Sequence, residues 1–146
     1  MVPLGDTIAY SGPGPDGNLD LWLIDDDGTN AHPLVVEDGD DLWASWSPDA
    51  SAIAFTVDGT LAIVDVDTGA NTPVEVDRDV IGDTPLEFAS WGPTGRIAFI
   101  AGSDIWTVQP DGTEPLKVGG SPGRDVTPAW SPDNELIAFI GSSWHG

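Results

Sequence analysis

A pattern about forty residues long recurs along the whole chain. Its clearest copy is Trp130-Ser131-Pro132-Asp133, followed shortly by Ile137-Ala138-Phe139. The other copies are Trp46-Ser47-Pro48-Asp49 with Ile53-Ala54-Phe55, Trp91-Gly92-Pro93 with Ile97-Ala98-Phe99, and the isolated second half Ile8-Ala9-Tyr10. The three tryptophans lie 45 and 39 residues apart. A period of this length is typical of repeat architectures, so we expect the chain to consist of similar supersecondary units.

A second motif separates the copies, and it joins an alternating apolar run to a turn rich in Asp and Gly. The runs are residues 19–24, 61–66 and 104–108, with turns at Asp27-Gly28-Thr29, Asp67-Thr68-Gly69 and Asp111-Gly112-Thr113. Another short apolar run follows each turn. Alternation at period two suits strands, and Gly after Asp supplies the positive φ of a tight hairpin. Each period therefore holds four strands, and no helix is expected because no long 3.6-residue periodicity is present.

The repeat resembles that of the TolB-like (WD40-like, PD40-type) β-propeller family, in which Pro-x-Trp-Ser-Pro-Asp-Gly precedes Ile-Ala-Phe. Residues 127–133 match best, whereas Gly92 replaces Ser, and Ala50 and Asn134 replace the final Gly. The resemblance covers about residues 6 to 143. It implies an all-β fold of four-stranded antiparallel blades, with the Trp strand innermost and the Ile-Ala-Phe strand second. Propellers of this type serve as binding scaffolds, receptor outer domains and gating domains of peptidases, so the resemblance specifies the fold better than the activity.

The predicted organisation is a single propeller segment over residues 1–146, with repeats at about 6–41, 42–83 and 84–124 and a partial repeat at 125–143. Counted by the family pattern, the four repeats supply three, four, four and two strands. Closed propellers need about four blades or more, so we expect a half-propeller completed by a second copy into the six-bladed ring that the resemblance implies. The predicted assembly residues are Ile8, Tyr10, Trp130, Phe139 and Trp144.

Three alternatives to the closed dimer stay open. Ile8-Ala9-Tyr10 and Ile137-Ala138-Phe139 both claim the second-strand position of the shared blade, which leaves room for a larger ring. Complementary half-rings could also link into a filament or sheath, because unpaired strand edges favour association. Finally, the chain could be a fragment of a longer propeller.

Charge is the second constraint from the sequence. The chain has 25 acidic residues against four Lys and Arg, a net charge of −21. Such an excess is typical of salt-adapted proteins, because salt screens the self-repulsion; the alternative is that the turns simply require Asp. A saline or extracytoplasmic environment is favoured. Nucleic acid and anionic membranes are excluded as partners, since Lys and Arg drive binding to both, and no apolar run is long enough to span a bilayer.

A protein-binding surface is predicted where the loops enter the innermost strands, because in the family these loops gather around the mouth of the central channel. Its candidate residues are Asp40, Asp41, Trp43, Arg78, Asp79, Arg124 and Asp125. Salt bridges between blades are the competing interpretation of the Asp and Arg residues, and packing is the competing interpretation of Trp43. The other repeated aromatic residues are predicted to pack between blades.

The sequence offers no recognisable catalytic constellation. Its histidines are His32 and His145, it contains no cysteine, and neither a nucleophile elbow nor a phosphate-binding loop is present. The acidic run around Asp27 lacks the spacing of a calcium loop and is interpreted as a hairpin turn. We therefore predict a non-catalytic scaffold that assembles with itself and binds a protein, without a cofactor. A cation-dependent sugar or peptide binder is the remaining alternative.

Overall fold

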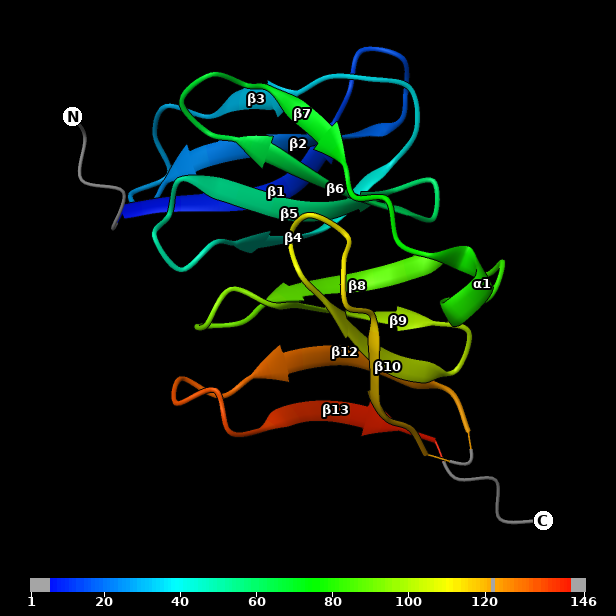
Figure 1. Ribbon diagram of the computed structural model, residues 1–146. Coiled ribbons are helices and arrows are strands. Elements are labelled where there is room, and N and C mark those ends of the chain that lie inside the picture. Colours follow the sequence, from blue (N-terminus) through cyan, green and yellow to red (C-terminus); the bar gives the residue numbers. More distant parts are fainter. Residues whose placement is uncertain (1–5, 122, 143–146) are drawn as a thin grey trace.

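The chain folds into four antiparallel sheets stacked along the molecule (Figure 1). The computed structural model describes residues 6–121 and 123–142. The sheets contain three, four, four and two strands in chain order, as the repeat predicts. The first sheet and the two-stranded sheet lie at opposite ends of the stack (Figure 1).

Strand order follows chain order within every sheet, which is the meander of a propeller blade. The first sheet comprises β1 (Thr7–Pro13), β2 (Leu19–Asp25) and β3 (His32–Val35). The second comprises β4 (Asp41–Trp46), β5 (Ala52–Val57), β6 (Thr60–Asp65) and β7 (Asn71–Pro73). The third comprises β8 (Leu86–Trp91), β9 (Ile97–Ala101), β10 (Asp104–Val108) and β11 (Leu116–Gly119). The last comprises β12 (Asp125–Trp130) and β13 (Ile137–Gly141).

The first sheet begins at the second strand of a blade. Its β1 carries Ile8-Ala9-Tyr10 and pairs with β2, just as β5 pairs with β6. The last sheet supplies a first and a second strand, because β12 ends at Trp130 and β13 begins with Ile137. The structure thus contains both strands that claim the second position, β1 and β13.

One helical turn corrects the expectation that the chain has no helix. This is α1 (Arg78–Ile81), in the connection from β7 to β8. The Asp77 side chain caps it by accepting a hydrogen bond from the Asp79 backbone N–H, and Gly82 ends it at a φ of 87°. A single capped turn has too few residues to produce helical periodicity in the sequence.

The apolar side chains fill the spaces between successive sheets. One cluster joins the first and second sheets and includes Leu21, Ile53 and Phe55. A second cluster joins the second and third sheets and includes Ala54 and Phe99, with Trp91 and Trp106 packed against it. The prediction that the repeated aromatic residues pack between blades is confirmed for these members.

Short polar bonds hold the turns and account for many of the Asp residues. Asp27 and Asp111 each accept bonds from the backbone N–H and the hydroxyl of the Thr two positions on, at 2.6 to 3.0 Å. Asp49 accepts the hydroxyl hydrogen of Ser47 at 2.7 Å. These bonds stabilise the ionised carboxylates, and they hold the pKa of Asp49 down at about 2.

Candidate interaction surface on the innermost strands

The three innermost strands β4, β8 and β12 follow one another across the stack and are tied together by hydrogen bonds. The Trp91 backbone N–H donates to Ser45 Oγ at 2.8 Å, which links β8 to β4. Trp130 Nε1 donates to the Ser90 carbonyl oxygen at 3.1 Å, which links β12 to β8. In a TolB-like propeller these strands line the central channel, so their common face is the candidate interaction surface.

Each innermost strand contains a β-bulge at the same position. The pairing register shifts between Leu42 and Ser45, between Glu87 and Ser90, and between Val126 and Ala129. At each shift one residue has a positive φ: 60° at Trp43, 59° at Phe88 and 51° at Thr127. Residues that are not Gly rarely adopt this conformation, and bulges redirect side chains away from the regular pattern of a strand.

The three bulge residues form a continuous wall. The rings of Trp43 and Phe88 pack with their centroids 4.1 Å apart and a tilt of 36° between their planes. With Ala44, Ala89, Thr127 and Pro128 they line a hollow of about 180 Å³, which we call the bulge hollow. Trp43 remains 42% exposed. The side chain predicted from sequence to bind a partner is thus accessible, although it also packs against Phe88.

Asp41, at the start of β4, is completely buried. Its Oδ2 accepts a hydrogen bond from the Leu21 backbone N–H at 3.1 Å, whereas its Oδ1 has no protein partner. Burial raises the pKa of this carboxyl to about 7, and repulsion from Glu37, Asp20 and Asp40 adds to the effect. Asp41 is therefore a structural group under electrostatic stress rather than an accessible contact for a partner.

The other predicted partner-binding residues are not gathered at one place. Arg78 and Asp79 lie on α1, and the position that matches Asp41 and Asp125 in the third sheet is Leu86. Arg78 and Asp79 therefore do not lie at the entrance of an innermost strand as Arg124 and Asp125 do, because α1 lengthens the connection before β8.

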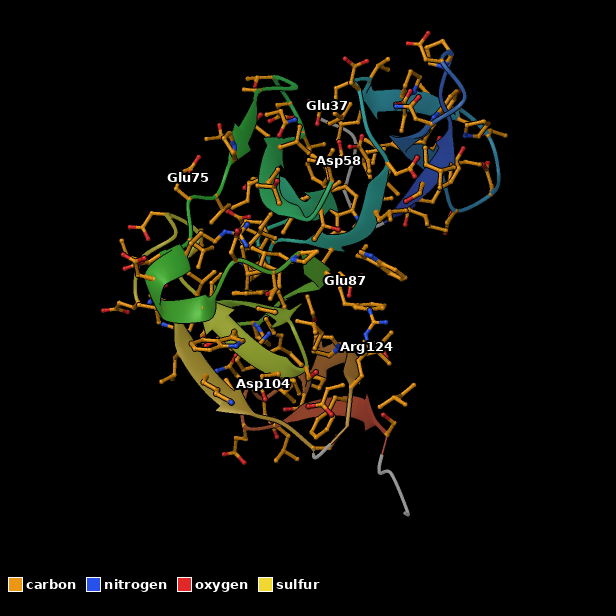
Figure 2. The ribbon with its side chains drawn as sticks, turned by 90° about the vertical axis from the view of Figure 1, so that its right-hand side faces the viewer. Glu37, Asp58, Glu75, Glu87, Asp104 and Arg124 are labelled. Atoms are coloured by element: carbon orange, nitrogen blue, oxygen red, sulfur yellow. The ribbon has the colours of Figure 1, made fainter. Side chains whose placement is uncertain are left out.

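The remaining candidates at the strand entrances make local contacts. Asp125 is buried and accepts two bonds from Ser121, at 2.9 and 2.5 Å. Asp40 accepts the Leu19 backbone N–H at 2.8 Å. Arg124 pairs with Glu87 on the preceding innermost strand, and Figure 2 shows its side chain reaching toward Glu87. This pair links neighbouring innermost strands, but its acid is Glu87 on β8 rather than one of the predicted Asp residues.

At the far end of the same strands, the three Trp-Pro turns line a second groove, of about 460 Å³. The ring of Trp130 lies on Gly92, where an added Cβ would come within 2.7 Å of the indole. This contact explains why Gly92 departs from the Ser of the repeat. Among the predicted assembly residues, Ile8 and Phe139 are 51% and 43% exposed and Tyr10 and Trp130 are half-buried, while Trp144 lies outside the described residues.

Sequence reasoning missed Phe88, Thr127 and the bulge that presents them. The signal was available, because all three bulge residues stand three positions before the repeated Trp. Of the three, the sequence predicts only Trp43 as a binding residue, because Phe and Thr at the other two positions are typical of ordinary strands.

Over residues 6–121 and 123–142, no group of three or more His, Cys, Asp or Glu side chains is arranged to hold a metal ion. In the same ranges, no helix has the length and apolarity needed to cross a membrane.

The chain is similar in sequence to proteins several times its length. A protein of Emericella nidulans assigned as dipeptidyl peptidase 4 is 32% identical, with 68% of this chain aligned to 16% of that protein. A TolB homologue of Chlorobium luteolum is 28% identical, with 86% of this chain aligned to 29% of the homologue. The chain thus spans less than a third of the length of either relative. No family profile matches it.

Solved structures show the same fold. A protein assigned as TolB from Agrobacterium tumefaciens superposes with a TM-score of 0.78 at 20% identity, covering 97% of this chain and 53% of that one. TolB from Acinetobacter baumannii gives 0.74 at 19% identity, covering 93% and 36%. A gluconolactonase from Xanthomonas campestris gives 0.72 at 13% identity, covering 92% and 50%. Enzymes thus share this architecture, and the fold by itself does not decide the activity.

The stacked four-stranded meanders and the neighbouring innermost strands define a β-propeller scaffold. The phased repeats and the TolB relatives in sequence and structure support a TolB-like β-propeller family for this fold.

Proposed function

We propose that the chain is a non-catalytic scaffold that closes a propeller with a second copy of itself and presents its innermost strands to a protein partner. The observation that carries the proposal is unequal burial of equivalent strands. Phe99 and Ile100 are fully buried in β9, whereas the equivalent Phe139 and Ile140 on β13 are 43% and 65% exposed. Apolar surface left in water at both ends of the stack favours association.

The other end of the stack is open in a matching way. On β1, Ala9 packs on the core shared with the second sheet, so alternation places Ile8 and Tyr10 on the opposite face. Tyr10 lies against Trp22 there, with ring centroids 6.4 Å apart. This face carries the same residue types that blades two and three bury against their neighbours.

In the blade shared by two copies, both β13 of one copy and β1 of the other could be the second strand, and their pairing favours β1. Among the described strands, β13 pairs only with β12, and most of its residues are exposed, whereas β1 is held by pairing along all seven residues with β2. In the assembly, β13 gives way and β1 of the second copy pairs with β12. The incoming β2 and β3 then cover Leu116 and Val118 of β11, which are 58% and 48% exposed.

Light scattering coupled to size exclusion tests the proposal, in low and in molar salt. The expected mass is twice the 15.3 kDa of the chain and independent of concentration. Leu116→Asp should lower the mass to that of a monomer, because it places a charge where β2 and β3 of the second copy pack on β11. Leu136→Asp is the matched control, since Leu136 is 70% exposed and lies in the turn before β13. A wild-type monomer at micromolar concentration would refute self-assembly, and a mass that grows with concentration would indicate a filament instead.

Partner binding by the scaffold is supported by the open innermost strands and by the TolB relatives. Its test is separate from the mass measurement, because a partner can bind a monomer or a dimer. The chemistry of such a partner follows from the bulge hollow.

A further inference from the structure

We infer that the bulge hollow binds a cationic side chain, arginine or lysine, carried by a peptide segment of the partner protein. The inference rests on the proposed role as a protein-binding scaffold and names the chemistry that the site recognises. Trp43 and Phe88 form its aromatic floor, and Thr127 continues the wall onto the third innermost strand.

The backbone points to a functional role for these rings. A bulky residue at positive φ is an unfavourable conformation, and such residues gather at ligand-binding sites. Here the conformation recurs at the same place in three strands, at φ values of 60°, 59° and 51°. The positive φ interrupts the regular alternation of the strand and points the side chains of the bulge residues toward the hollow. Trp43 therefore keeps 42% of its surface exposed while Phe88 holds its ring in place.

The negative charge of the protein favours a cationic side chain as the ligand of the bulge hollow. The chain has a net charge of −21, and each of its four basic side chains is already engaged. Three form salt bridges, Arg96 with Glu114, Lys117 with Asp104 and Arg124 with Glu87, while Arg78 donates to the Thr84 carbonyl oxygen at 2.6 Å. An excess of negative charge concentrates cations at the surface, and exposed indole and phenyl faces attract them further. Nucleobases also stack on aromatic rings, but their phosphates would be repelled.

Binding is tested with a seven-residue peptide that carries three arginines, titrated into the full chain at 0.15 M salt and followed by calorimetry. The comparison peptide replaces each arginine by citrulline, which keeps the shape and removes the charge. We expect the arginine peptide to bind about 5- to 30-fold more tightly than the citrulline peptide, the range of a cation–π contact that is partly shielded from water.

Three variants assign the binding to the bulge hollow. Trp43→Gly removes the ring and suits the positive φ, so the variant should fold and bind the arginine peptide about 5- to 30-fold more weakly. Thr127→Trp extends the aromatic wall and should bind more tightly than the wild type. Val80→Ala is the control, because Val80 is an exposed apolar residue on α1 and its loss should change nothing.

Several outcomes would overturn the inference. These are equal affinity for the two peptides, absence of binding by the wild type, and unchanged binding by Trp43→Gly. Binding of a neutral disaccharide such as cellobiose, without binding of the arginine peptide, would assign the hollow to sugars instead. The mass of the protein is measured on the same samples, so that this inference and self-assembly are tested separately. A dimer that does not bind the arginine peptide refutes only this inference. A monomer that binds the peptide refutes only self-assembly.

Discussion

Replacing the buried Asp41 by Asn should stabilise the protein, and the gain should increase with pH. The Asp41 carboxyl is completely buried, one of its oxygens has no protein partner, and its pKa rises from an ordinary value of 3.8 to about 7. Asn keeps the shape and can still accept the bond from the Leu21 backbone N–H. Its amide can also donate, which suits the acidic surroundings.

The magnitude follows from linkage between protonation and folding. A carboxyl whose pKa is raised in the folded state stabilises the fold fully below its unfolded pKa, and this contribution is lost as pH rises toward the folded value. Each pH unit between about 4 and 7 therefore costs about 1.4 kcal/mol, and the loss levels off above pH 7 at no more than about 4 kcal/mol. The Asn variant lacks this group, so its advantage over the wild type should grow across the same interval.

Urea unfolding followed by tryptophan fluorescence measures the effect, with both proteins at one concentration and at pH 5, 6, 7 and 8. The free-energy difference between Asn variant and wild type should be small at pH 5 and a few kcal/mol larger at pH 8. Asp40→Asn is the matched control, because Asp40 is more accessible and accepts the Leu19 backbone N–H. A difference that does not change with pH, or a wild type that becomes more stable from pH 5 to 7, would refute the reasoning.

Three further predictions concern the turns of the repeat and are measured by chemical unfolding. Ala50→Gly should raise the free energy of unfolding by about 1 kcal/mol, because Ala50 has a φ of 59°; no gain would mean that the turn has relaxed. Gly92→Ser should lower it by about 1 to 3 kcal/mol and shift the emission of Trp130, because the added Cβ meets the indole; an unchanged spectrum would contradict the contact. Asp49 stabilises the fold through its depressed pKa, so stability should fall as pH drops from about 4 toward 2, and Asp49→Asn should flatten that part of the pH profile.

The repeat predicted the architecture well because its signals are local. Trp46, Trp91 and Trp130 each end an innermost strand, and the Asp-Gly turns join strands where expected. A strand count of three, four, four and two follows from these markers alone. Alternation and turn chemistry operate over a few residues, so they can be read without knowledge of the tertiary structure.

The candidate site could be predicted only in part, because its geometry depends on contacts between strands. Trp43 was predicted as a contact residue, but its pairing with Phe88 comes from two bulges in neighbouring sheets. The sequence predicts Asp41 as a contact for a partner, whereas the structure buries it at the start of β4. The sequence predicts Arg78 at the entrance of an innermost strand, but the capped turn α1 lengthens this connection and places Arg78 before that entrance. None of these features leaves a periodic trace in the sequence.

In each innermost strand, the residues that determine the blade fold are different from the bulge residue that is presented on the surface. Residues that pair, such as Ser45 and Ser90, specify the blade, whereas the bulge residue takes no part in the register and is Trp, Phe or Thr in the three copies. Substitutions at this position can therefore accumulate without a compensating change in the sheets. The bulges therefore offer one residue per blade that can be changed while the sheets stay the same. Directed evolution of partner recognition in this scaffold should begin at these positions.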